Sequence, residues 1–437
     1  MGLSRSLSTG ASSLKAHQTR FDVISNNLAN SNTIGFKSSR VNFVDQLSQT
    51  QRFGFAPDNG VGGLNPQQVG LGVRVGSTTK NMNQGAIEFT NRPLDMALNG
   101  NGFFVYSLNG QQLFSRAGSV DRDVAGNIVD TASGAFLQGY NVQLDSTFRP
   151  VKDANGVNIL NRQISNISIG EEVISQPRQT ENISFIGNLD NEMEIGQSQS
   201  TSIKIFDNTG GTRDLSLTFS KSAESTYNVQ ANIDGIDVNL DSTTITFNSD
   251  GTLQDPFALN LTAADLNAAL GGEQRFDETT PKDVVITLGD PTNIVSKSIT
   301  NFSGTTDITP QSQDGYQSGN LVGLSVGPTG LIQGQFSNNQ TEILGQVVMA
   351  KFANSEALLS RGNNFFENTP NSGIPNFGTA GDNFPSTTIY GSALEQSNVD
   401  LTEEFTDMIS TQRAFEAASR TITVSDTLLG ETNQLKR

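Results

Sequence analysis

The sequence predicts a mainly β protein with terminal α-helices, in which nested β-domains are inserted between N- and C-terminal coiled-coil helices. Apolar residues recur at heptad spacing at both ends of the chain, which indicates helices with a packed seam. Between the ends, short alternating stretches are separated by turns rich in Gly and Asn, the pattern of strands and hairpins. The 437 residues are 16% charged and 35% hydrophobic and include 43 glycines. This composition is typical of a β-rich extracellular surface.

A helix is predicted over about residues 3–28. Its heptad column of large side chains is Leu7, Leu14, Phe21 and Leu28. The alternate column is Leu3, Gly10, His17 and Ile24. His17 occupies a column position, and we interpret it as a packed or water-facing histidine rather than a ligand or a pH switch.

A second helix is predicted over about residues 399–435, and its start carries a capping-box-like pair, Asp400 and Glu403. Its large side chains are Met408, Phe415, Ile422 and Leu429, and the smaller ones between them are Thr411, Ala418, Ser425 and Thr432. The stripes of the two helices are complementary. The ends of the chain are therefore expected to meet in space, with everything between them forming an insertion.

The eight large column residues of the two helices are predicted to form a self-assembly seam. Its members are Leu7, Leu14, Phe21, Leu28, Met408, Phe415, Ile422 and Leu429. Two paired helices bury only the stripes that face each other, whereas Val23, Ile409 and Leu428 lie off these columns. More than one neighbouring helix is needed, and a polymer of like subunits would supply them.

A polar run over residues 25–37 follows the first helix. Asparagines tolerate left-handed backbone and bond their own main chain, while Gly35 permits a positive φ, so this run predicts a helix stop and a shaped turn. Its motifs Asn26-Asn27-Leu28-Ala29-Asn30 and Asn32-Thr33-Ile34-Gly35-Phe36-Lys37 resemble the signature of bacterial flagellar rod and hook proteins. The matching signature residues are Asn26, Asn27, Leu28, Asn30, Asn32, Gly35 and Phe36.

The far end of the chain carries the same resemblance. Residues 391–401, 405–409 and 412–415 are similar to the C-terminal block of that family. The run from Pro93 to Phe104 resembles the opening of the family's first β-domain.

Hairpins are predicted at three turn signals in the first β-domain, namely Asn99-Gly100, Asn109-Gly110 and Ala125-Gly126-Asn127. The clearest alternation follows in a second β-domain, where Ile203, Ile205, Leu215, Leu217 and Phe219 point to one face. A short helix over residues 263–270, capped by Thr262, is also expected there. Residues 41–80 have no regular pattern and are interpreted as an irregular, extended arm.

The resemblance and these patterns together give four parts. They are a terminal helical domain of residues 1–32 and 395–437, an extended connecting region of residues 33–80 and 386–394, a first β-domain of residues 81–170 and 304–385, and an outer β-domain of residues 171–303.

No catalytic, cofactor-binding or metal-binding residues are predicted. The net charge of −17 makes a nucleic-acid partner improbable, because a phosphate backbone requires clustered Lys and Arg. With no cysteine and one histidine, the chain lacks thiolate sites and imidazole clusters. Asp121-Arg122-Asp123 begins like a calcium loop, but Ala132 occupies the position of the bidentate carboxylate. No stretch approaches the ~18 apolar residues of a membrane span, so no membrane insertion is expected.

The resemblance implies a structural subunit of the flagellar hook that polymerises into a curved flexible tube and transmits torque from rod to filament as a universal joint. The additional β-domain favours hook over rod, since rod proteins lack so large an insertion. Three alternatives stay open at this point: a distal-rod or other axial subunit, an extracellular β-rich adhesin, and a glycan-acting enzyme that uses Asp207 or Asp214.

The partners implied by the resemblance are first of all other copies of the same chain, in a helical homopolymer. They also include the hook cap, the distal rod, the hook-filament junction protein and the flagellar type III export apparatus. The expected location is extracellular, in the flagellum, after export without a cleaved signal peptide.

Overall fold

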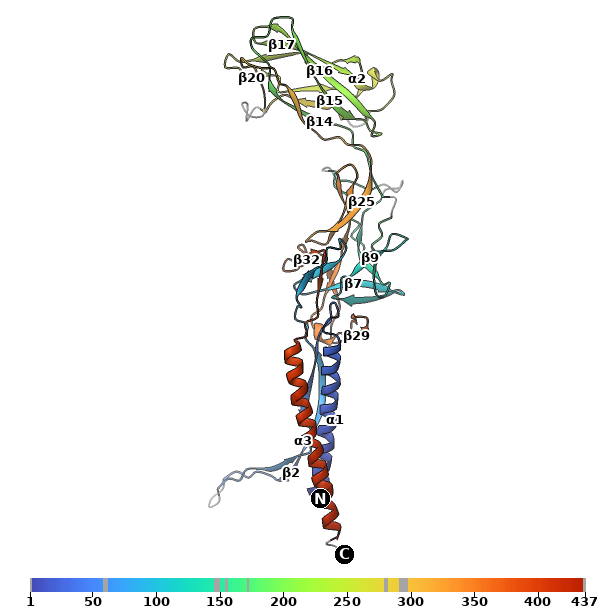
Figure 1. The fold of residues 1–437 in the computed structure, drawn as a ribbon, viewed down its shortest axis with the longest axis vertical. Helices are drawn as coiled ribbons and strands as arrows, with labels where there is room; N and C mark the ends of the chain where they lie inside the picture. Colours follow the sequence, from blue (N-terminus) through green and yellow to red (C-terminus); the bar gives the residue numbers. More distant parts are fainter. Residues whose placement is uncertain are drawn as a thin grey trace. The chain divides into compact units, whose positions relative to one another are not determined.

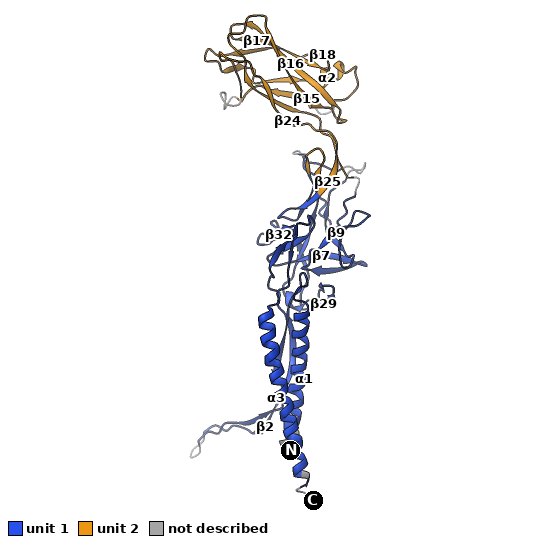
Figure 2. Cartoon of the chain, viewed as in Figure 1, with its two compact units in different colours: residues 1–171, 324–334, 342–437 blue, residues 172–323, 335–341 orange. Residues whose placement is uncertain are grey.

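The computed structural model describes residues 2–57, 62–144, 150–153, 156–170, 173–278, 282–290 and 298–434. The chain divides into two compact units, coloured separately in Figure 2. Unit 1 contains residues 1–171, 324–334 and 342–437, and unit 2 contains residues 172–323 and 335–341.

Unit 1 brings the two ends of the chain together. Helix α1 (Gly2–Ala29) and helix α3 (Leu401–Gln434) lie side by side and run antiparallel, as Figure 1 shows. Both predicted helices are thus confirmed, although α3 begins two residues later than expected and Leu435 lies outside the described residues. Helix α3 starts where Asp400 Oδ1 accepts hydrogen bonds from the backbone N–H groups of Thr402 (2.8 Å) and Glu403 (3.3 Å), which satisfies donors that the first helical turn leaves free.

The region after α1 is more regular than the sequence indicated. Strand β1 (Ser39–Asp45) pairs antiparallel with β4 (Val73–Lys80), and β2 (Ser48–Arg52) pairs antiparallel with β3 (Gln67–Gly70). The prediction of an irregular arm is therefore wrong. Strands β2 and β3 are mostly exposed on both faces, so their sequences lack the apolar alternation that marks a half-buried strand.

The strands next to the helices join distant parts of the chain. Strand β5 (Ile87–Phe89) pairs with β33 (Ala393–Glu395), and β6 (Met96–Asn99) pairs with β32 (Thr388–Gly391). The hairpin predicted at Asn99-Gly100 is consequently absent, because β6 pairs with a strand almost 300 positions away. The hairpin predicted at Asn109-Gly110 is present and joins β7 (Phe103–Leu108) to β8 (Gln111–Ser115). Both turn residues have a positive φ, 52° for Asn109 and 80° for Gly110.

Strands β7 and β8 belong to the main sheet. Its path from β25 to β29 is β25-β26-β27-β11-β7-β8-β30-β29. The further strands of this path are β11 (Phe136–Asn141), β25 (Gly319–Val326), β26 (Leu331–Phe336), β27 (Thr341–Val347), β29 (Leu359–Gly362) and β30 (Phe365–Glu367). Side strands are β9 (Val120–Arg122), β10 (Ile128–Asp130), β12 (Ser165–Asn166), β28 (Met349–Lys351) and β31 (Asn376–Gly378), and a 3-10 turn covers Ser355–Ala357. Edge-to-face contacts of Phe103 with Phe352 and Phe366 consolidate a core beside this sheet.

Unit 2 has its own apolar core between two sheets. One sheet consists of β14 (Asn182–Asn188), β21 (Ala258–Leu261), β22 (Val284–Thr287), β23 (Ile299–Thr300) and β24 (Thr309–Gln313). The other consists of β15 (Ser198–Phe206), β16 (Thr212–Ala223), β17 (Thr226–Ile233), β18 (Ile236–Val238), β19 (Thr244–Phe247) and β20 (Leu253–Asp255). A short strand, β13 (Ile174–Ser175), pairs with β25.

The alternation predicted for unit 2 is confirmed. Leu215, Leu217 and Phe219 on β16 are completely buried, together with Ile205 on β15. Helix α2 (Ala263–Ala269) is present where expected, and the Thr262 hydroxyl accepts a hydrogen bond from the N–H of Asp265.

Candidate functional site

Asn27, one of the predicted signature residues, ties three segments together at the end of α1. Its side chain is almost fully buried. The amide nitrogen Nδ2 donates to the carbonyl of Ser39 and to Glu404 Oε1, both at 2.8 Å, while Oδ1 accepts from the N–H of Ser39 at 2.9 Å. One amide therefore links α1 to the start of β1 and to the first turn of α3.

A buried ionic cluster lies beside this link. Lys37 Nζ is 2.7 Å from Glu395 Oε1, and Arg116 Nη1 is 3.4 Å from Glu395 Oε2. The side chains of Lys37 and Glu395 are completely buried, and that of Arg116 is 3% exposed. Lys37 also donates to the carbonyl of Asn83, and Glu395 accepts from the N–H of Gly85. Burial lowers the pKa values of Lys37 and Arg116, and the charge of Glu395 opposes that shift.

The remaining signature residues shape the turn before this cluster. Gly35 has a φ of +67°, and a Cβ at this position would lie 2.6 Å from the backbone nitrogen of Ala117, so only glycine fits. Asn30 Nδ2 donates to the carbonyl of Asn26 at 2.9 Å, which closes the end of the helix. Leu28 and Phe36 are half-buried, whereas Asn32 is exposed.

The ionic cluster was not predicted as a site. Lys37 and Glu395 both lie inside the motif blocks that carry the family resemblance, so these motifs could have indicated the two residues as part of a site. Nothing in the sequence around Arg116 indicates its role, because it comes from the loop between β8 and β9. Together the three side chains fix the point where both terminal helices join the β-strands.

Small residues let the two helices approach closely. A Cβ built on Gly10 would lie 2.8 Å from Ile422 Cγ1, and Ser6 Oγ is 3.0 Å from Ser425 Oγ. The most buried described positions of α3 are Thr411, Ala418 and Ser425, three of the four members of the predicted column of smaller side chains, whereas the fourth, Thr432, is exposed.

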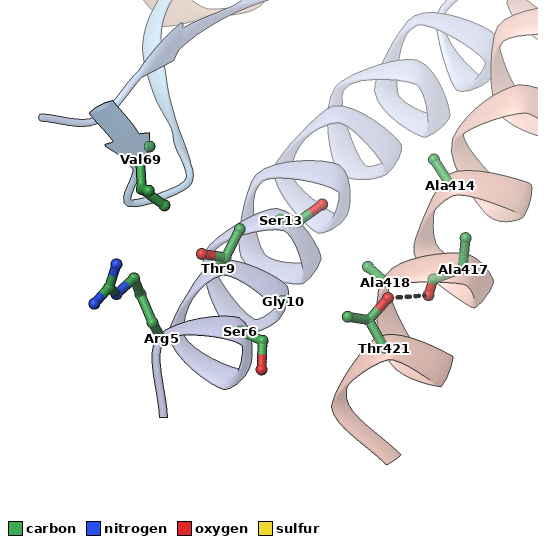
Figure 3. Close-up of a pocket in the computed structure, with 11 residues that line it drawn as sticks. Arg5, Ser6, Thr9, Gly10, Ser13, Val69, Ala414, Ala417, Ala418 and Thr421 are labelled. Atoms are coloured by element: carbon green, nitrogen blue, oxygen red, sulfur yellow. Dashed lines mark hydrogen bonds between the residues drawn. The ribbon is translucent and has the colours of Figure 1, made fainter. Parts of the chain in front are cut away.

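Figure 3 shows a hollow of about 710 Å³ along this contact, between α1 and α3. Its wall is made mostly of small side chains, including Ala414, Ala417, Ala418 and Thr421 of α3. Val69 of β3 also lines it. The pairing of these two helices therefore leaves open space along their contact.

The predicted seam residues flank this contact and are only partly covered. Leu7, Leu14, Phe21, Leu28, Met408, Ile422 and Leu429 are half-buried. Phe415 is 42% exposed. Their role in self-assembly stays a prediction.

Helix α3 also carries large apolar side chains that its pairing with α1 leaves largely uncovered. The exposed members are Leu401, Phe405, Ile409, Phe415, Val424 and Leu428, with exposures between 42% and 58%. No exposed large apolar residue is found on the described part of α1. We call these six residues the outer apolar face of α3. Large apolar side chains left exposed on one helix indicate an interaction surface.

Of the two carboxylates considered for catalysis, one is buried in a turn and the other is exposed on a strand. Asp207 is buried in the turn between β15 and β16, where its Oδ1 accepts hydrogen bonds from the N–H groups of Thr209 and Gly211. Asp214 is exposed on β16. The residues that the structure describes contain no cluster of His, Cys, Asp or Glu suited to a metal ion. In the same part of the chain, no helix is long and apolar enough to cross a membrane.

Comparison with known proteins identifies the family. Over 475 aligned residues the chain is 34% identical to the flagellar hook protein FlgE of Treponema pallidum (strain Nichols), and the alignment covers 99% of this chain and 100% of that relative. The chain belongs to the FlgE family of flagellar hook proteins. FlgE of Borreliella burgdorferi is 33% identical, with 99% of both chains covered, and FlgE of Escherichia coli (strain K12) is 32% identical, with 97% and 98% covered.

Four models of flagellar protein families match segments along the chain. Residues 7–37 match "Flagella basal body rod protein", and residues 391–435 match "Flagellar basal body rod FlgEFG protein C-terminal". Residues 97–175 match "Flagellar hook protein FlgE/F/G D1 domain", and residues 179–316 match "Flagellar basal body protein FlaE D2 domain". The FlgE family is structural and non-enzymatic, which removes the glycan-acting enzyme from the alternatives.

We predict that Glu395→Gln destabilises unit 1 by about 3–5 kcal/mol, because it leaves Lys37 and Arg116 buried without a carboxylate. Urea unfolding of the full chain, followed by circular dichroism, measures the change. The control is Glu367→Gln, which removes an ion pair with the exposed Arg361 and is expected to cost less than about 1 kcal/mol. Equal effects of the two substitutions would contradict the importance of the buried cluster.

A second prediction concerns Glu404, whose pKa is raised mainly by burial, against the hydrogen bond from Asn27. A raised carboxyl pKa contributes stability below the unfolded-state pKa, and this contribution is lost as pH rises through the folded-state pKa. Glu404→Gln imitates the protonated form and still accepts the bond from Asn27. The variant should therefore unfold at a slightly higher temperature than the unchanged chain at pH 7, and the difference should vanish below about pH 4.

Thermal unfolding at both pH values tests this prediction. Glu224→Gln, in an exposed turn, serves as a control that should alter neither value. A lower unfolding temperature of Glu404→Gln at pH 7 would show that the carboxylate form is favoured in the folded chain.

Proposed function

We propose that this chain is the structural subunit of the flagellar hook and that its copies polymerise into a curved, flexible tube. The tube would transmit torque from rod to filament as a universal joint. The observation that carries the proposal is the outer apolar face of α3, which remains uncovered after α3 has paired with α1. Membership of the FlgE family supports the hook as the place of assembly.

Covering this face gives a driving force for assembly. Burying a Val, Leu, Ile or Phe side chain completely contributes about 1.5–3 kcal/mol, and the six residues of the face are each roughly half exposed. Their combined burial contributes on the order of several kcal/mol per copy, before the cost of ordering is subtracted. Contacts between unlike faces of identical copies generate open helical filaments when the rotation from one copy to the next does not close a ring.

The four parts expected from the sequence receive separate tasks in this proposal. Residues 1–32 and 395–437 form the inner wall of the tube, where helices from several copies pack together. Residues 33–80 and 386–394 connect this wall to the outside. The first β-domain, residues 81–170 and 304–385, and the outer β-domain, residues 171–303, slide against neighbouring copies as the curved hook turns.

Further partners follow from this placement in the flagellum. The ends of the tube would contact the distal rod and the hook-filament junction protein, and the growing end would contact the hook cap. The subunit would reach that end unfolded, through the flagellar type III export apparatus.

Phe415→Ala is expected to reduce polymer formation at least tenfold while the β-domains remain folded, because it removes a large exposed ring from α3. Leu14→Ala on α1 is expected to act in the same direction. Polymer is measured by electron microscopy of the purified chain and of hooks on cells, and folding by circular dichroism. Val124→Ala is the matched control, since Val124 is fully exposed in a turn and contributes to neither helix. Hooks of normal length on cells that carry Phe415→Ala would contradict the proposal.

A further inference from the structure

A second pocket, of about 460 Å³, opens between α1 and α3 near the middle of their contact. The two helices contribute side chains at matching positions. From α1 come His17, Gln18, Phe21 and Asp22, and from α3 come Thr411, Gln412, Phe415 and Glu416. Each helix thus supplies a glutamine, a phenylalanine and an acidic residue in the same order and spacing.

Two side-chain atoms of the residues that line this pocket have no hydrogen-bond partner. They are His17 Nδ1 and Thr411 Oγ1, and both are buried. Thr411 is 1% exposed. Burial and the neighbouring Arg20 lower the pKa of His17, so its imidazole is neutral at pH 7 and able to offer an acceptor nitrogen. Buried polar atoms without partners are rare in folded proteins, which points to a group that binds here.

The walls of the pocket define the chemistry of that group. Because the helices are antiparallel, Phe21 lies one turn from His17 toward one end of the pocket, and Phe415 lies one turn from Thr411 toward the other end. Asp22 and Glu416 are exposed and have no ion pair among the described residues. Aromatic rings, two acceptors and two carboxylates together suit a guanidinium group, which stacks on rings and carries five donors.

Matching cations lie on the opposite side of α3. Arg413 follows Ile409 by four positions, and Arg420 precedes Val424 by four positions, so both arginines share a stripe with exposed apolar residues. Both arginines are exposed, and neither has an ion pair within the described part of the chain. The outer apolar face of α3 therefore carries the type of side chain that the pocket accepts.

We propose that the pocket around His17 and Thr411 binds an arginine from the outer face of α3 of a second copy, either Arg413 or Arg420. The guanidinium donates to His17 Nδ1 and Thr411 Oγ1 and pairs with Asp22 and Glu416, while the apolar neighbours of the arginine cover Phe21 and Phe415. This inference rests on the proposed polymerisation and specifies which surfaces meet in it.

Charge exchange across the interface tests the pairing. Asp22→Arg is expected to lower the yield of polymer from the purified full-length chain at least tenfold, as measured by sedimentation and electron microscopy. Arg413→Glu or Arg420→Glu should produce the same loss. Combining Asp22→Arg with the effective arginine variant should restore most of the polymer, since the opposite charges then face each other again.

The substitution Thr411→Val distinguishes a loss of binding from a loss of folding. It removes the unpaired hydroxyl at nearly constant shape, so the monomer should be equally stable or more stable in urea unfolding. Polymer formation should nevertheless fall severalfold. The control is Thr421→Val, because Thr421 bonds its own helix at 3.0 Å and lines the other hollow.

Several outcomes would overturn the inference. Normal polymerisation of Asp22→Arg, of both arginine variants or of Thr411→Val would show that the pocket receives no arginine from a second copy, while the proposed hook function would stand. A double variant that polymerises no better than its parents would likewise reject the pairing. A failure of the unchanged chain to polymerise at all would reject the proposed function and this inference together.

Discussion

The incomplete burial of α3 is the constraint on which the rest of this structure depends. Close approach to α1 uses the small residues of α3, with Thr411, Ala418 and Ser425 at the contact. The large side chains are therefore displaced to the flanks and to the outer face. A pair of helices can bury one stripe on each helix, and α3 carries apolar residues around more of its circumference than one partner covers.

The junction where the helices join the β-strands has the opposite character, because its charged side chains are buried and paired with one another. Asn27, Lys37, Glu395 and Arg116 connect the end of α1, the start of α3 and the first strands through hydrogen bonds and ion pairs. Breaking a buried ion pair is strongly destabilising, because it leaves an uncompensated buried charge. The helix pair is thus anchored firmly at one end, while its exposed sides remain available to other copies.

The sequence predicted the helix pair better than it predicted the junction. Heptad columns such as Leu7 to Leu28 predicted both helices and their pairing, because the period of a helix is local information. The ladder of β2 and β3 was missed, since strands exposed on both faces carry no alternation. The partners of Glu395 could not be found, because Lys37 and Arg116 lie 358 and 279 positions away in sequence. The four-part division of domains and the roles of the seam residues remain predictions.

Amide hydrogen exchange, compared between the monomer and the assembled polymer, tests the central claim most directly. An isolated helix pair with an uncovered apolar face is marginally stable. The account therefore predicts weak protection of residues 401–434 in the monomer and strong protection in the polymer, with the core of β16 protected in both states. Strong and equal protection of α3 in the dilute monomer would mean that one copy completes its own burial, and this result would contradict the account.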